Sequence, residues 1–277
     1  MKKISRRSFM AAAAVSVAAL ALTACGGSAS SAASVASSAA SSEAASSAAA
    51  AELTTVEAGK LTMATNAAFP PYEMTTDAGE FEGIDIDTAK AIAEKLGLEL
   101  QIDDMDFDAA LLSVQQGKAD IVMAGVTVTD ERKAVMDFSD SYATGIQSII
   151  VPEGSDITSP DDLAGKKIGT QRGTTGYIYC SDDFGDDAVV AYDDGLTAVQ
   201  ALNNGQVDAV VIDNAPAKEF VAANPGLVIL DTSYAEEDYA IGLAKGSALE
   251  DAVNAALEEL KADGTLQSIV DKYITAE

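Results

Sequence analysis

One pattern occurs twice in this chain and constrains its fold more than any other feature. It consists of a helical segment, a glycine, two further residues, an aspartate and an apolar strand, and its two copies are residues 110–125 and 198–213. Aligning Gly117 with Gly205 puts Gly125 opposite Asp213. Helices that alternate with strands predict an α/β sheet, and such sheets bind ligands beyond the carboxyl ends of their strands. The pattern is also common in α/β proteins. It is therefore weak evidence for an internal duplication of the chain, and stronger evidence for where the carboxyl ends of the two strands point.

The segment after the first copy predicts a site for an anion. Thr129 is suited to cap a short helix, which places Arg132 at the third helical position, where a cation opposes the helix dipole. A guanidinium beside unpaired backbone N–H groups suits a carboxylate. A solvated Arg132 that pairs with Glu131 or Asp130 is an equally open interpretation. If the two copies belong to two facing lobes, Arg132 and Asp213 lie across one cleft.

The remaining elements follow from periodicity and from glycine and proline signals. We expect strands over 60–65, 98–102, 120–124 and 167–170, and helices over 85–96, 108–116 and 248–262, followed by a last amphipathic helix. Two prolines in residues 66–73 predict a loop without regular structure.

Charge and composition exclude several functions. The chain carries 44 acidic and 17 basic residues, for a formal net charge of −27, so nucleic-acid binding is excluded. It contains no histidine, and outside the amino-terminal region its one cysteine is Cys180, which we interpret as a small buried hydrophobe. We expect no metal and no cofactor. The calcium-like spacing of Asp104, Asp106 and Asp108 lacks the glycine and the final glutamate of a calcium loop.

The amino terminus predicts export and a lipid anchor. Residues 1–24 combine four basic residues with a short apolar run, which is typical of a signal peptide. Cys25 follows Leu-Thr-Ala, as in a bacterial lipobox, and residues 25–57 are mostly a Ser/Ala-rich tether. The adjacent arginines leave the general and twin-arginine export routes open. We therefore expect a protein anchored at the outer face of the cytoplasmic membrane, at the cell surface or in the periplasm.

Several motifs together resemble the polar amino-acid solute-binding proteins (family 3) of ABC importers. They are TNAAFPPYE at 65–73, GIDID at 83–87, GVTVTDER at 125–132, DFS at 137–139, GTT at 173–175 and VVID at 210–213. The resemblance implies an α/β periplasmic-binding-protein fold of type II, with two sheets, flanking helices and two hinge crossings. It places lobe 1 at about 58–143 and 239–277 and lobe 2 at 144–238, with crossings near 142–148 and 237–241.

The same resemblance assigns the binding residues. Arg132, Thr127 and the backbone N–H of Thr175 would bind the α-carboxylate of an amino acid. Asp213 and the carbonyl of Gly125 would bind its α-ammonium. The side chain would lie between Phe69 and Phe107, with Asn66, Gln171 and Thr174 at its end. Relatives for cationic or amide side chains often carry an acid where Asn66 stands, so a neutral polar L-amino acid is favoured, with basic ones next. The implied protein is a monomer that serves an importer permease and is not an enzyme.

Two alternatives remain open at this point. A few relatives are dehydratases acting on prephenate-like acids, which would need a general acid in the cleft, and Glu73 is the nearest candidate. A soluble amino-acid sensor, read by a receptor in its closed form, is the other.

Overall fold

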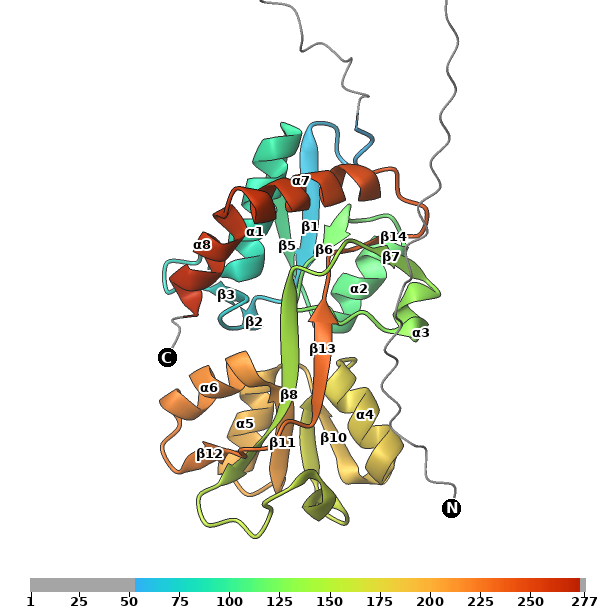
Figure 1. Ribbon diagram of the computed structural model, residues 1–277. Coiled ribbons are helices and arrows are strands. Elements are labelled where there is room, and N and C mark those ends of the chain that lie inside the picture. Colours follow the sequence, from blue (N-terminus) through green and yellow to red (C-terminus); the bar gives the residue numbers. More distant parts are fainter. Residues whose placement is uncertain (1–52, 275–277) are drawn as a thin grey trace, which may run out of the picture. The chain divides into compact units, whose positions relative to one another are not determined.

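A computed structural model describes residues 53–274 (Figure 1). The predicted signal peptide, Cys25 and most of the predicted tether lie outside the described residues. Within residues 53–274, no helix has both the length and the apolar character that a membrane span requires.

The first half of the chain and one strand from near its carboxyl end build a five-stranded sheet in the order β5-β1-β6-β14-β7. Its strands are β1 (Lys60–Thr65), β5 (Glu99–Asp104), β6 (Ile121–Val122), β7 (Met136–Phe138) and β14 (Gly242–Ala244), of which β5, β1 and β6 run parallel. Leu61 and Met63 point to one face and pack with helices α1 (Ile84–Leu96), α7 (Glu250–Ala262) and α8 (Thr265–Tyr273). Ala64 points to the other face and packs with α2 (Phe107–Gln115). The alternation along β1 thus buries both faces of the sheet.

The second sheet has six strands. Its order is β10-β9-β11-β8-β12, with β13 paired to β8, and its strands are β8 (Ala143–Pro152), β9 (Ile168–Gln171), β10 (Val189–Tyr192), β11 (Ala209–Asp213), β12 (Leu227–Ile229) and β13 (Ala235–Tyr239). Val211 packs with α4 (Thr175–Phe184) on one face. Val210 and Ile212 pack on the other face with α5 (Gly195–Asn203) and α6 (Asn214–Ala223). The 3₁₀ helices η1 (Pro160–Leu163) and η2 (Asp186–Ala188) complete this part.

Two antiparallel strands connect the sheets. The chain leaves the first sheet after β7, enters the second along β8, leaves it along β13 and returns at β14. β8 and β13 lie side by side, with Ala143 opposite Tyr239 and Gln147 opposite Ala235 (Figure 1). The predicted fold class, with two sheets and two crossings, is confirmed.

The repeated pattern of the sequence occupies equivalent places in the two sheets. β6 lies next to β1, and β11 lies next to β9. Asp120 accepts a hydrogen bond from the backbone N–H of Thr62 at 2.8 Å, and Asp208 accepts one from that of Lys167 at 2.7 Å. Each aspartate therefore holds the neighbouring strand at its first residues, and the strand that follows it ends at the carboxyl edge of its sheet.

The prediction for residues 66–73 was wrong. This segment contributes to a small antiparallel sheet of β2 (Ala68–Phe69), β3 (Glu73–Thr75) and β4 (Phe81–Glu82). The two prolines occupy the turn between β2 and β3, which is closed by a hydrogen bond of 3.0 Å from the N–H of Tyr72 to the carbonyl of Phe69. Because the paired residues flank the prolines, no ladder hydrogen bond is lost.

Candidate ligand-binding site

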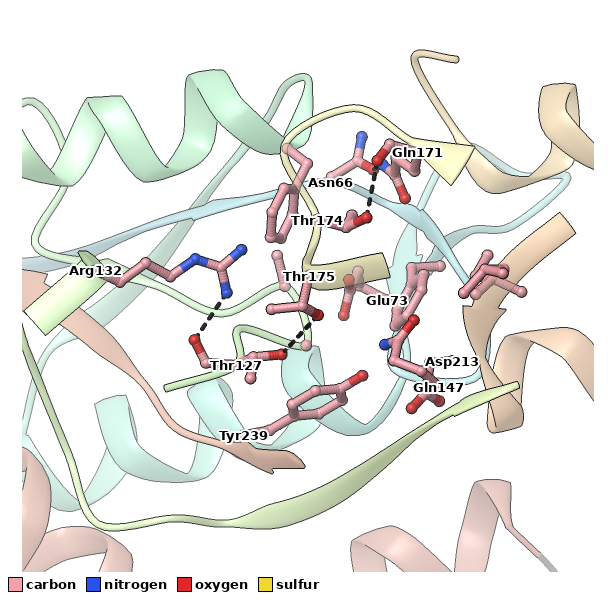
Figure 2. Close-up of a pocket in the computed structure, with 16 residues that line it drawn as sticks. Asn66, Glu73, Thr127, Arg132, Gln147, Gln171, Thr174, Thr175, Asp213 and Tyr239 are labelled. Carbon is pink, nitrogen blue, oxygen red and sulfur yellow. Dashed lines mark hydrogen bonds between the residues drawn. The ribbon is translucent and has the colours of Figure 1, made fainter. Parts of the chain in front are cut away.

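A single cavity brings together all ten residues that were predicted to bind a ligand. They are Asn66, Phe69, Phe107, Gly125, Thr127, Arg132, Gln171, Thr174, Thr175 and Asp213. Glu73, Ala124, Gln147, Val211, Ile212 and Tyr239 complete its lining (Figure 2), and the empty space at the site, including the part open to solvent, is about 440 Å³. Residues attached to both sheets face this space, as expected for a site at the carboxyl ends of the strands.

Arg132 enters the cavity from the short helix α3 (Asp130–Lys133). The predicted cap is present, because the Thr129 hydroxyl accepts a hydrogen bond from the Arg132 backbone N–H at 3.2 Å. The side chain is 8% exposed and lies over the Phe107 ring, 5.4 Å from its centroid. Its Nη1 donates to the carbonyl of Thr127 at 2.8 Å, and its Nη2 donates to the carbonyl of Gly173 at 3.1 Å. Burial lowers the pKa of this guanidinium, which nevertheless stays charged.

The charge of Arg132 forms no ion pair among the described residues. Among residues 53–274 no carboxylate lies within 4.0 Å of it, so the solvated pairing with Glu131 or Asp130 does not occur. A buried cation costs free energy unless an anion compensates it. The guanidinium has five N–H donors, and two of them reach backbone carbonyls.

Asp213 is the matching anion. It ends β11 and caps α6, with Oδ1 accepting from the N–H of Ala215 at 2.9 Å and Oδ2 from that of Ile146 at 2.8 Å. The residue is 2% exposed, and burial raises the pKa of its carboxyl to about 6. No lysine or arginine of the described chain lies within 4.0 Å of it. One cavity thus holds a buried cation and a buried anion, and neither forms an ion pair with another residue of the described chain.

Gly125 supplies backbone to the same wall. Its N–H donates to Asp85 Oδ2 at 3.0 Å, and its φ of 55° lies in the left-handed region. A Cβ at this position would come within 2.9 Å of Cε1 of Phe69. Backbone conformation and close packing therefore both require glycine here.

The predicted polar end of the cavity is already partly hydrogen-bonded. Gln171 Nε2 donates to Asn66 Oδ1 at 2.8 Å and to the carbonyl of Asp193 at 3.2 Å, while Asn66 Nδ2 donates to the carbonyl of Met105 at 2.9 Å. Both N–H groups of the Gln171 amide are therefore used, and its oxygen remains as an acceptor. The Thr174 hydroxyl donates to the Gln171 carbonyl at 2.8 Å and accepts from the N–H of Tyr177 at 3.3 Å, so the methyl group and one lone pair of the hydroxyl oxygen remain for a ligand.

Three residues around the cavity were missed from the sequence. Gln147 and Tyr239 line it, and Glu237 lies directly behind it, accepting from Gln147 Nε2 at 3.0 Å. All three belong to the connecting strands β8 and β13. The available signal was a polar glutamine in an apolar run at the predicted hinge, but the pairing that brings it to the cavity joins residues about 90 positions apart.

Glu73, which lines the cavity, forms a buried carboxyl pair with Asp85. Neither is exposed, and Asp85 Oδ2 accepts from the Gly125 N–H and from the Tyr142 hydroxyl at 2.8 Å. Burial, followed by the charge of Asp85, raises the pKa of Glu73 well above its ordinary value, while burial raises that of Asp85 to about 6. At neutral pH Glu73 is therefore the protonated member and Asp85 the ionised one.

This assignment predicts opposite responses to two similar substitutions. Glu73→Gln should change the free energy of unfolding at pH 7.5 by less than about 1 kcal/mol, because an amide replaces a neutral carboxyl. Asp85→Asn should lower it by about 2–3 kcal/mol, because the ionised acceptor of two buried hydrogen bonds is lost. Urea unfolding of both variants measures the difference. A larger loss for Glu73→Gln would mean that Glu73 carries the charge.

The comparison with known families decides what kind of protein presents this cavity. The profile of the bacterial extracellular solute-binding proteins, family 3, matches residues 61–276. The chain belongs to this family. The resemblance read from the sequence motifs is thereby confirmed, and so is the expectation of an extracytoplasmic protein.

Individual relatives agree with the family. A probable histidine-binding protein of Neisseria gonorrhoeae is 33% identical over 274 residues, which cover 96% of this chain and 95% of the relative. The arginine-binding extracellular protein ArtP of Bacillus subtilis is 33% identical over 230 residues, covering 79% and 87%. The solved structure of an ancestral arginine-binding protein bound to glutamine has a TM-score of 0.75 and 43% identity, covering 79% of this chain and 99% of that one. These relatives are binding proteins, which favours binding over the dehydratase and sensor alternatives.

Proposed function

We propose that this family 3 solute-binding protein captures an L-amino acid between two closing lobes and delivers it to an ABC importer. The carrying observation is the pair of buried charges, Arg132 and Asp213, which face one cavity from different sheets and form no ion pair among the described residues. An amino acid is a zwitterion and needs one cation and one anion at its binding site. In this assignment Arg132 binds the α-carboxylate with a bidentate pair, and Asp213 binds the α-ammonium.

Backbone groups complete the binding of the amino-acid head. The backbone N–H groups of Thr127 and Thr175 make no hydrogen bond among the described residues, so both can donate to the α-carboxylate. The Thr127 hydroxyl already donates to Glu237 at 3.1 Å, so its backbone, rather than its hydroxyl, is the donor in this proposal. The carbonyl of Gly125 is an acceptor for the α-ammonium.

The far end of the cavity supports a ligand side chain with N–H donors. Gln171 keeps an acceptor oxygen, and Phe69, Phe107 and Thr174 line the same cavity. A neutral polar side chain, for which glutamine is the model, fits these groups best, and a basic side chain is the next candidate.

Closure follows from contacts between the two parts of the chain. We assign residues 58–143 and 239–277 to lobe 1 and residues 144–238 to lobe 2. Arg132 of lobe 1 reaches the carbonyl of Gly173 at 3.1 Å, and Gln171 of lobe 2 reaches Asn66 at 2.8 Å. A ligand held by Arg132 and Asp213 adds to these contacts and stabilises the closed state.

Export and anchoring belong to the same proposal. The family is extracellular, and we infer that a lipid on Cys25 holds the folded body to the membrane through the 25–57 tether. Cys25→Ala should release the protein from membranes. Continued membrane fractionation of that variant would exclude the lipid anchor.

A thermal-shift screen tests the function. The body comprising residues 52–277 is heated with each of the twenty amino acids, cystine, ornithine and prephenate. Saturation at a thousand times the dissociation constant stabilises a protein by about 4 kcal/mol, which is readily visible as a shift in Tm. A shift with one or a few L-amino acids, glutamine first, is expected. The absence of any shift with amino acids would refute the proposal.

A further inference from the structure

Glu237 is a buried carboxylate with an unusual set of partners. It lies on β13, is 7% exposed, and its Oε2 accepts hydrogen bonds from Thr127 Oγ1 at 3.1 Å, Thr175 Oγ1 at 3.0 Å and Gln147 Nε2 at 3.0 Å. The donors come from the segment after β6, from the start of α4 and from β8, respectively. Glu237 therefore joins both sheets and the connection between them.

All three donors line the cavity, and Figure 2 labels each of them, whereas Glu237 is not among the lining residues. Within the described chain, no lysine or arginine lies within 4.0 Å of its carboxylate, although its charge raises the pKa of the Arg132 guanidinium against the effect of burial. Its Oε1 is buried without a hydrogen-bond partner. A buried charge that serves stability alone would be expected to have its acceptors satisfied. In Glu237, all three donors bind Oε2, the oxygen that contacts the cavity-lining residues.

Counting hydrogens shows what this arrangement does to the threonines. A hydroxyl has one hydrogen, and in both Thr127 and Thr175 it is donated to Glu237. The two oxygens are 3.4 Å apart and present only lone pairs to their surroundings. The two hydroxyls can accept from an ammonium group but cannot donate to a carboxylate, so Glu237 determines that they act as hydrogen-bond acceptors.

We propose that Glu237 is a positioning residue for ligand binding: it fixes the hydroxyl orientation of Thr127 and Thr175 and, through them, ties the two sheets around the amino-acid head. This inference rests on the proposed function and extends it to a residue behind the cavity. Because Glu237 acts on groups that face the head, its effect is independent of the ligand side chain.

Glu237→Gln tests the proposal, since the amide has nearly the same shape but carries no charge. Its neutral oxygen accepts hydrogen bonds more weakly than a carboxylate, so both threonine hydroxyls are held less firmly and the link between the two sheets weakens. The affinity for every amino acid that the wild type binds should fall by the same factor, on the order of ten- to a hundredfold, with the preference among them unchanged. Glu236→Gln is the matched control, because Glu236 is exposed on the same strand and the substitution makes the same chemical change. Calorimetric titration should give it wild-type affinity.

A double-mutant cycle separates positioning from general destabilisation. Thr127→Val and Thr175→Val together remove the hydroxyls on which Glu237 acts, so adding Glu237→Gln to that pair should change affinity by less than about twofold. Additive losses, or a Glu237→Gln affinity within twofold of the wild type, would overturn the proposal.

If Glu237→Gln does not fold, the affinities of Thr175→Ser and Thr175→Val are compared instead. The serine variant should retain affinity and the valine variant should lose it, and equal affinities would overturn the proposal. A wild type that binds no amino acid refutes the proposed function and this inference with it. If the wild type binds an amino acid, the variants test the role of Glu237 alone.

Discussion

Arg132→Met should weaken amino-acid binding by a factor of about thirty to several thousand. The range corresponds to the roughly 2–5 kcal/mol lost when one partner of a buried, hydrogen-bonded charge pair is removed. Arg132 is the buried cation of the cavity, and no protein carboxylate competes for it among residues 53–274. Without it, the ligand α-carboxylate would be buried with backbone N–H donors alone.

The same substitution should leave the ligand-free protein folded. Methionine is unbranched and apolar, and removing an uncompensated buried charge offsets the loss of the hydrogen bonds to the carbonyls of Thr127 and Gly173. We expect the free energy of unfolding to change by no more than about 1 kcal/mol. Affinity and stability should therefore separate, which distinguishes a binding residue from a structural one.

Arg172→Met is the matched control for Arg132→Met. Arg172 is the other arginine of the described chain, but it is exposed and its nearest acid is Asp193 at 3.4 Å. Its substitution should leave affinity within twofold, since an exposed ion pair contributes little. Equal losses for the two variants in calorimetric titration would contradict the assignment of Arg132 to the α-carboxylate.

The position of Arg132 could be predicted because its signal is local. Thr129 sets the phase of α3, and the cap is present as expected. The position of Asp213 could be predicted for a related reason. Asp120 and Asp208 hold neighbouring strands in the same way, so the residues that follow them end their strands at equivalent edges.

Glu237 and Gln147 could not be predicted, because nothing near either residue in the sequence indicates its partner. Their contact depends on the register of β8 against β13, which is fixed by packing across the whole connection. The hairpin of β2 and β3 was missed for the opposite reason. The prolines were read as excluding strands, although the residues that pair lie outside them. The burial of Arg132, which decided between its two interpretations, is likewise a property of the assembled cavity.

The raised pKa of the Asp213 carboxyl predicts that amino-acid binding weakens as the pH falls below about 6. In the free protein its pKa is about 6, because burial opposes ionisation more than the N–H donors of Ala215 and Ile146 favour it. A bound α-ammonium stabilises the ionised form and lowers that pKa. Between the two pKa values each unit of pH then costs close to a factor of ten in affinity, so binding at pH 5 should be about tenfold weaker than at pH 7.

The ligand-free protein should respond in the opposite sense. Because the folded pKa of Asp213 lies above its unfolded value, this group stabilises the fold below about pH 4, and that contribution is lost as the pH rises through 6, by about 3 kcal/mol at most. Asp85 titrates in the same range and adds a similar term. Subtracting the pH dependence of the free energy of unfolding of Asp213→Asn from that of the wild type gives the contribution of Asp213, since Asp85 is present in both proteins.

Asp213→Asn should therefore bind weakly at every pH and lose the acid-side decline that the wild type shows. Calorimetric titrations at pH 5, 6, 7 and 8 measure both effects, with urea unfolding of the ligand-free proteins at the same pH values. The α-carboxylate and the α-ammonium of the ligand keep their charges over the acidic part of this range, so a decline below pH 6 belongs to the protein. An Asp213→Asn variant that keeps the wild-type pH profile would assign the titration to Asp85 and leave Asp213 as a helix cap. A profile that is flat in both proteins would mean that the α-ammonium does not contact a buried carboxylate.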